Sequence, residues 1–392
     1  MVNVQLMTNY KIYRFWTFIL FISSMYSWFT FTISTSFITI PSLFIFYKCY
    51  KSDPNIFNAK INKIFAFISL LFFLNLCRNV NIFGVINYII IWVCLLGYMS
   101  LNTKYKYDII KYITEKFAIL LAISLVVYIL YAFGVPLPHT SLSYGIRYEF
   151  NNYYFFLQRD KVMRFHSIFL EPGHMTMGLA PLLFINNYNL KNKYVAILFI
   201  SQLLSLSLAG YIVLVIGYLL SLFINSDYSR KIQSIVLIIS SFVAFLIVCT
   251  MVWKDFSFQE AILNRLIFED GTLSGYNRTG EAFDYFYDHI MSTDDKWFGV
   301  SWKESDFDHG VAGYKRFVVT SGLVGLILSL LLYLMPIFIT FKKDSVFLVI
   351  ILLLLLFQNA YPDWWCLLII LCCGINYMEI NKNENALYTT FQ

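Results

Sequence analysis

The run VFLVIILLLLLFQNA, residues 346–360, contains no charged side chain and decides the class of fold. A second uncharged run extends from residue 232 to residue 253. The hydrocarbon core of a bilayer is about 30 Å thick, and a helix of roughly 20 apolar residues crosses it. Since 59% of the residues are hydrophobic and only 13% are charged, the sequence predicts an all-α polytopic integral membrane protein and excludes a string of soluble domains.

Apolar segments recur along the whole chain and predict about twelve transmembrane helices. The runs 15–47 and 194–224 are too long for one straight helix and short for two, so each is interpreted as a tight hairpin. Lys11 and Arg14 precede an apolar run without a small-residue cleavage site, which favours a signal anchor over a removable signal peptide. The predicted spans are 15–31, 33–47, 61–77, 82–100, 117–134, 165–186, 194–208, 210–224, 232–253, 316–341, 345–360 and 362–379.

The distribution of basic residues predicts the orientation. With a cytoplasmic N-terminus, lysine and arginine gather in the inner loops and both termini are cytoplasmic. The net charge of +6 then reflects the basic residues of the cytoplasmic loops and does not indicate a binding site for an anionic ligand. The predicted organisation is helices one to five in 1–134, a first large outer loop in 135–163, helices six to nine in 164–253, a second large outer loop in 254–315, and helices ten to twelve with a cytoplasmic tail in 316–392.

The second outer loop carries its own helical signals. Ser257 and Glu260 form a capping box, SFQE, ahead of an apolar segment. The segment EAFDYFYDHI, from Glu281, places its apolar residues on one stripe of a helix. We expect these helices either to lie along the outer membrane surface or to cap a cavity.

One predicted span opens on an unusually charged stretch, RFHSIFLEPGHMTMG, residues 164–178. Pro172 lacks an N–H and cannot continue a helix from Arg164, so the helix is expected to start at Pro172 with Glu171 at its mouth. A helix N-terminus beside an arginine suits a phosphate group. Glu171 would repel that anion, and two other roles remain open for it: it orients Arg164 in an ion pair, or it acts as a general base toward a sugar hydroxyl.

Three features together resemble the Wzy family of O-antigen and capsule repeat-unit polymerases, relatives of the O-antigen ligases. They are the run R-x-x-S-I-F-L-E-P-G-H from Arg164 to His174, the loop end WFGVSW (297–302) followed by GYKRFVVTSGLVGLILSLLLY (313–333), and the twelve-span layout with two large external loops. The resemblance covers most of the chain, and the layout is shared better than the sequence.

The resemblance implies a metal-independent glycosyltransferase with a GT-C-type fold, placed in the bacterial inner membrane with its active site facing the periplasm. Such an enzyme moves a growing glycan from undecaprenyl diphosphate onto the terminal sugar of a new undecaprenyl diphosphate-linked repeat unit. No cofactor is expected. A Wzz-type chain-length regulator and a Wzx-type flippase are implied as partners, in addition to the lipid-linked substrates and the membrane.

The resemblance also suggests site residues, because arginines in the two outer loops are thought to hold the diphosphates. Glu171 is the first choice for a catalytic base, and His309 is the second, although Gly310 follows it where the ligase pattern has an asparagine. The residues expected to bind diphosphate are Arg164, Arg278, Arg316 and His174, and Arg164 is also expected to take part in catalysis.

Several outer-loop residues have both a functional and a plain interpretation. Arg147 and Tyr153, the latter within YEFNNYYFF (148–156), can contact glycan or serve as a solvated charge and an interfacial ring. Asp306 and Asp308 are interpreted as solvated, so no metal site is predicted. The acidic balance of the second outer loop argues against binding to nucleic acid.

Two rival functions remain open. An O-antigen ligase uses a similar donor but transfers the glycan to the lipid A core, and the missing His-Asn pair counts against it. A repeat-unit flippase also has about twelve spans, but transporters usually show two similar halves and helices broken at the midplane. The two halves of this sequence are unlike. The sugars and their linkage are not encoded in any readable motif.

Overall fold

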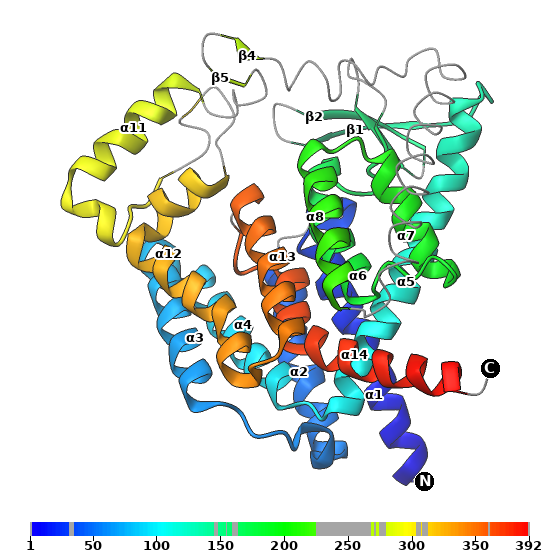
Figure 1. Cartoon of the computed structure of the whole chain (residues 1–392). Coiled ribbons are helices and arrows are strands. Elements are labelled where there is room, and N and C mark those ends of the chain that lie inside the picture. Colours follow the sequence, from blue (N-terminus) through cyan, green and yellow to red (C-terminus); the bar gives the residue numbers. More distant parts are fainter. Residues whose placement is uncertain are drawn as a thin grey trace. The chain divides into compact units, whose positions relative to one another are not determined.

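The computed structural model describes residues 2–30, 35–144, 148–153, 155–158, 164–224, 268–269, 272–273, 280–302, 307, 313–359 and 361–390. Twelve α-helices lie in this part of the chain (Figure 1). They are α1 (Val2–Ser23), α2 (Thr35–Ser52), α3 (Lys63–Leu76), α4 (Ile82–Ser100), α5 (Thr103–Ala132), α6 (Pro172–Ile185), α7 (Lys193–Leu204), α8 (Leu208–Ile224), α11 (Glu281–Ser292), α12 (Gly313–Thr340), α13 (Lys343–Asn359) and α14 (Trp365–Thr390).

Four helices are long and apolar enough to cross a membrane: α4, α5, α12 and the first part of α14, Trp365–Lys382. They indicate a helical, membrane-embedded protein, as predicted. Eleven of the twelve predicted spans overlap a helix, and the span 232–253 lies outside the described residues. Both predicted hairpins consist of two helices. However, α7 has 12 residues and is about 18 Å long, less than the bilayer core. The twelve-span count therefore stays a prediction.

The segment predicted as the first outer loop contains a small sheet that the helical prediction did not include. Its antiparallel strands β1 (Thr140–Tyr144), β2 (Tyr148–Asn152) and β3 (Phe156–Gln158) pair in sequence order. Aromatic residues favour strands when one face is covered, and here Phe150 and Phe156 pack with Leu170 in a buried cluster. A further strand pair joins β4 (Phe268–Glu269) to β5 (Thr272–Leu273).

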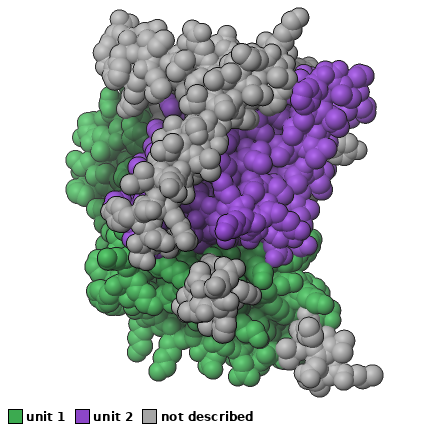
Figure 2. Space-filling model, turned by 45° about the vertical axis from the view of Figure 1, so that its right-hand side comes forward, with its two compact units in different colours: residues 1–24, 33–113, 277–392 green, residues 25–32, 114–276 purple. Residues whose placement is uncertain are grey.

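The chain divides into two compact units, which Figure 2 shows in different colours. Unit 1 comprises residues 1–24, 33–113 and 277–392, and unit 2 comprises residues 25–32 and 114–276. In unit 1, α1 packs on α2, α2 packs on α4, and α12 packs on both α3 and α13. In unit 2, α6 packs on α7 and α8. The units are thus built from interleaved parts of the sequence rather than from consecutive blocks.

Helix α12 is broken near its start, at Gly322, whose φ of 69° and ψ of −179° lie in a region open almost only to glycine. The break frees carbonyl groups that a continuous helix would use, and other groups bond them. The Val300 amide donates to Val319 O (2.7 Å), the Asn79 side chain to Thr320 O (2.6 Å), and the Asn75 side chain to Ser321 O (2.7 Å).

The break divides α12 into two segments of unequal length. The segment that follows it, residues 323–340, is about 27 Å long at 1.5 Å per residue and is nearly long enough to cross a bilayer alone. The break therefore separates a first segment, which carries Arg316, from a longer apolar segment.

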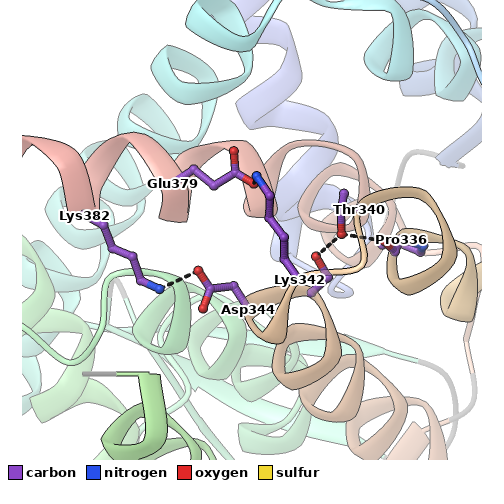
Figure 3. A network of polar contacts seen from close by, with 7 residues as sticks. Pro336, Thr340, Lys342, Asp344, Glu379 and Lys382 are labelled. Carbon is purple, nitrogen blue, oxygen red and sulfur yellow. Dashed lines mark hydrogen bonds and ion pairs between the residues drawn. The ribbon is translucent and has the colours of Figure 1, made fainter. Parts of the chain in front are cut away.

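Two neighbouring ion pairs join the start of α13, and the residue before it, to α14 in unit 1 (Figure 3). Lys342 Nζ lies 2.7 Å from Glu379 Oε1, and Lys382 Nζ lies 2.5 Å from Asp344 Oδ2. Glu379 and Lys382 are three residues apart and face the same neighbour, because side chains at this spacing share a helix face. These lysines belong to the set that the sequence places in the cytoplasm.

Candidate functional site

The charged stretch 164–171 in unit 2 is an irregular segment that backbone hydrogen bonds fix on three sides. The Phe165 amide donates to Leu204 O (3.0 Å), and Ser167 O accepts from the Phe156 amide in β3 (2.8 Å). On a third side, Ile168 O accepts from the Trp28 amide (2.8 Å). Buried backbone groups need such partners, and here they come from segments far apart in sequence.

Helix α6 begins at Pro172, as predicted, and Glu171 is its N-cap residue with an extended backbone. The Glu171 carbonyl accepts from the amides of His174 (3.1 Å) and Met175 (3.3 Å), while its side chain makes no capping bond. Its carboxylate is therefore held at the mouth of the helix without being used as a cap. This geometry is compatible with both roles proposed for Glu171.

His166 is the most buried ionisable residue of the stretch, with 4% of its surface exposed. Its Nδ1 lies within hydrogen-bond distance of Phe169 O, and its own carbonyl accepts from the Phe169 amide (3.0 Å). It lies outside the helices, and burial lowers its pKa to about 4. His166 is therefore neutral at physiological pH and holds a tight turn together.

The structure brings four predicted or neighbouring polar residues of the stretch together. The charges of Arg164 and of His174 lower the pKa of His166, while Glu171 raises it, so all three lie within electrostatic range of that ring. The His174 ring is 5.1 Å from the ring of Tyr26. A cationic and an anionic side chain, Arg164 and Glu171, thus lie in the same segment that leads into α6.

The aromatic residue predicted to contact glycan, Tyr153, is 7% exposed and lies among other rings. Its ring centroid is 5.0 Å from Tyr131, 4.8 Å from His139 and 5.6 Å from Phe155. These contacts show a packing role, and a role in glycan binding stays a prediction. Arg147 lies outside the described residues.

In unit 1, Arg316 lies in the first turns of α12 and contacts two aromatic rings. Its Cζ is 5.7 Å from the centroid of Trp302 and 5.7 Å from that of Tyr361, and its Nη1 donates to the Tyr361 hydroxyl (3.4 Å). We call Arg316, Trp302 and Tyr361 the arginine clamp. Both distances lie within about 6 Å, the range of a cation–π contact, so the two rings help to hold the guanidinium group in place.

Each ring of the arginine clamp is itself anchored. The Trp302 indole N–H donates to Thr320 Oγ1 (2.9 Å), and that hydroxyl donates to the carbonyl of Arg316 (2.9 Å). The Tyr361 ring stacks on Trp364 at 4.6 Å between centroids, with 5° between the ring planes. The clamp therefore positions Arg316 through groups on α12, on the preceding loop and on the turn before α14.

The neighbouring helix α11 confirms the amphipathic helix predicted from EAFDYFYDHI. Phe283 is buried and packs on Trp302 at 5.3 Å between centroids and on Phe307 at 5.1 Å. Lys315 Nζ lies 2.6 Å from Asp284 Oδ1, so this lysine is already paired with a carboxylate. The two adjacent cations, Lys315 and Arg316, thus have different surroundings.

The sequence-based prediction missed the turn YPDWW, residues 361–365, which brings Tyr361 into contact with Arg316. Asp363 lies outside both helices, and burial raises the pKa of its carboxyl group while the charge of Arg316 opposes that rise. A carboxyl group directly before an apolar span is uncommon, because charge is costly near lipid. This uncommon position was the feature of the sequence that could have drawn attention to the turn.

Some predicted residues lie outside the described part of the chain: Arg278, His309, Asp306, Asp308 and the capping box at Ser257. Among the described residues, no group of three or more His, Cys, Asp or Glu side chains is placed to hold a metal ion. Comparison of the chain with protein-family models, with curated proteins and with solved structures finds no match.

Proposed function

We propose that this chain is a membrane glycosyltransferase of the Wzy type, a polymerase of lipid diphosphate-linked repeat units. The observation that carries the proposal is the arginine clamp. It holds one cation in the first turns of α12, a helix long and apolar enough to cross a membrane. The diphosphate of a polyprenyl lipid lies at a membrane surface, so we expect the cation to meet it there. The resemblance of the stretch 164–174 and of the two-loop layout supports the same assignment.

The clamp suits the chemistry of the reaction. A sugar hydroxyl of the acceptor attacks the anomeric carbon of the donor, the bond from that carbon to the diphosphate oxygen breaks, and the electron pair leaves with the diphosphate. Negative charge grows on the leaving group, and an oriented guanidinium group can stabilise it without a metal. A guanidinium group fixed by ring contacts needs little reorganisation when that charge appears.

The residues at the start of α6 supply a second set of suitable groups. Arg164 and His174 are candidates to hold a lipid diphosphate, and Glu171 is a candidate to orient Arg164 or to accept a proton. Arg278 and His309 keep the roles that the resemblance suggests. The substrates are undecaprenyl diphosphate-linked oligosaccharides at the periplasmic face, and the chain-length regulator and flippase are proposed partners.

The test is a gel of surface polysaccharide from a strain that lacks the gene, complemented with the wild type or with Arg316→Ala, Arg316→Lys or Lys315→Ala. We expect a single-repeat band in the deletion strain and a ladder with the wild type. Arg316→Ala should abolish the ladder, and Arg316→Lys should restore little of it, because lysine lacks the planar fork. Lys315→Ala removes the adjacent cation, which lies against Asp284 rather than against the two rings, and should keep the ladder.

Immunoblots establish that each variant is made. A deletion strain with no repeat on the lipid A core would identify a ligase or a flippase and overturn the proposal. A full ladder with Arg316→Ala would remove the clamp from the mechanism. Loss of the ladder with both Arg316→Ala and Lys315→Ala would show that general charge, rather than the oriented arginine, matters.

A further inference from the structure

The turn after α3 carries an arginine, Arg78, that the proposed function does not yet use. It lies in the single-turn helix η3 (Cys77–Asn79), and its side chain is exposed. It is also the only lysine or arginine in the short loops that the predicted topology places outside. Basic residues normally gather in the cytoplasmic loops, so Arg78 departs from the pattern of the rest of the chain. A role other than orientation in the membrane therefore has to account for it.

Arg78 lies against the loop end WFGVSW, which also supplies a ring of the arginine clamp. Its Cζ is 4.1 Å from the centroid of the Phe298 ring, within the range of a cation–π contact. Among the described residues Arg78 takes part in no ion pair, whereas Lys315 of the same unit is paired with Asp284. A guanidinium group that rests on a ring and has no carboxylate partner keeps its N–H donors for an anionic ligand.

Hydrogen bonds tie this ring to the break in α12. The side chain of Asn79 donates to Phe298 O (3.1 Å) and to Thr320 O (2.6 Å). Thr320 also binds the support of the other arginine, because its hydroxyl accepts from the Trp302 indole N–H (2.9 Å). The rings under the two arginines are thus both tied to one residue of α12.

We propose that Arg78 binds the second phosphate group of the lipid diphosphate that Arg316 holds. The proposal rests on the proposed function. A diphosphate offers two phosphate groups, and each can accept a pair of hydrogen bonds from one guanidinium group. A lipid monophosphate offers only one such group. Arg78 therefore makes the site select a lipid diphosphate over a lipid monophosphate.

The plain alternative is that Arg78 only packs on Phe298 and holds the loop end in place. The two roles predict different results for a set of substitutions. If Arg78 binds phosphate, Arg78→Lys keeps a part of the binding, because lysine also binds phosphate as a point charge, and Phe298→Leu weakens binding less than Arg78→Gln does. If the contact is only structural, Phe298→Leu acts like Arg78→Gln.

The experiment measures the Kd of undecaprenyl diphosphate and of undecaprenyl phosphate for the full-length protein in detergent. The wild type is compared with Arg78→Gln, Arg78→Lys, Phe298→Leu and Arg316→Ala, and the melting temperature of each variant establishes that it is folded. Lys296→Gln is the matched control, since it removes a cation 6.0 Å from the ring of the neighbouring Trp297.

We expect Arg78→Gln to weaken binding of the diphosphate at least about tenfold and binding of the monophosphate less than about threefold, because Arg316 still holds one phosphate group. Arg316→Ala should weaken binding of both lipids, and Lys296→Gln should bind both as the wild type does.

An unchanged preference for the diphosphate in Arg78→Gln would overturn the role of Arg78 and leave the proposed function standing. Equal losses with Arg78→Gln and Phe298→Leu would overturn it too, in favour of the structural role. A wild-type protein that does not bind undecaprenyl diphosphate would overturn the proposed function, and this inference with it.

If Arg78→Gln does not accumulate, the wild-type protein is treated with phenylglyoxal, and mass spectrometry follows the modification of Arg78. Protection by undecaprenyl diphosphate and not by undecaprenyl phosphate supports the proposal. Equal modification of Arg78 with and without the diphosphate overturns it.

Discussion

At the scale of single residues, the stretch 164–171 shows how a charged sequence is accommodated inside a helical protein. His166 gives up its charge, and its ring contacts Phe169 O and lies 5.9 Å from the Phe150 ring. Ser167 takes a positive φ of 51° and pairs its hydroxyl with that of Ser124 at 2.7 Å. The stretch between Arg164 and Glu171 is therefore built around a neutral histidine.

A dependence of stability on pH follows from His166. Its pKa is about 4 in the folded protein and about 6.5 when exposed, so the unfolded chain binds the proton first as the pH falls. The contribution of His166 to the free energy of unfolding is complete above about pH 6.5. It decreases toward pH 4, by on the order of 3 kcal/mol. The apparent melting temperature in detergent, measured from pH 7 to pH 4.5, should show this decrease.

His166→Asn keeps a donor for Phe169 O but removes the titrating ring, so its melting temperature should decrease less over the same range. His139→Asn, which removes an exposed histidine, is the matched control and should follow the wild type. Identical curves for His166→Asn and the wild type would show that another group causes the pH dependence.

At the scale of elements, the break in α12 depends on two glycines that let two backbone segments meet. A Cβ on Gly322 would collide with the backbone at Trp297 and Phe298, and a Cβ on Gly299 would collide with Val319 and Thr320. The loop end WFGVSW and the start of α12 are therefore one packed structure. Trp302, a ring of the arginine clamp, follows three residues after Gly299.

Substitution of Gly322 should consequently destabilise the protein and displace the clamp. Gly322→Ala combines backbone strain of about 1–3 kcal/mol with the collision at Trp297. Gly134→Ala is the matched control, because Gly134 has a φ of +76° but open space around it. Its free energy of unfolding should decrease only by the backbone strain. Thermal unfolding of both variants in detergent checks the difference, and equal losses would show that the close approach is not needed.

The sequence predicted the helices better than the break within α12 and the turn before α14. Apolar runs predicted eleven helices, and Pro172 predicted the start of α6, because both signals are local. The break at Gly322 was not predicted, since its carbonyls depend on Asn75 and Asn79, more than 200 positions away. The contact between Arg316 and Tyr361 was overlooked for the same reason, since 45 positions separate the two residues.

At the scale of the whole molecule, the predicted orientation is testable without any substrate. The lysine-rich loops should face the cytoplasm and both large loops the periplasm. We expect single cysteines at Ser141 and Ser301, both exposed, to react with an impermeant maleimide in cells with a permeabilised outer membrane. Asn58→Cys should react only after lysis of the inner membrane.

The background for this experiment needs little change, because five of the six native cysteines in the described part of the chain are buried. Replacing Cys77 and Cys249 removes the partly exposed thiol and the one outside the described residues. Labelling of Asn58→Cys in intact cells, or protection of Ser141→Cys, would reverse or refute the orientation and with it the periplasmic site.

The bond from the Asn75 side chain to Ser321 O has a consequence for how the protein is made. The two residues are 246 positions apart, so the ribosome produces the partner of Asn75 about 10 to 50 seconds after Asn75 itself, at 5–20 residues per second. During that interval α3 is already synthesised with an amide group whose final partner does not exist. The helices translated last thus supply a hydrogen-bond acceptor to a helix translated early. A nascent chain truncated before α12 leaves the side-chain amide of Asn75 without this acceptor.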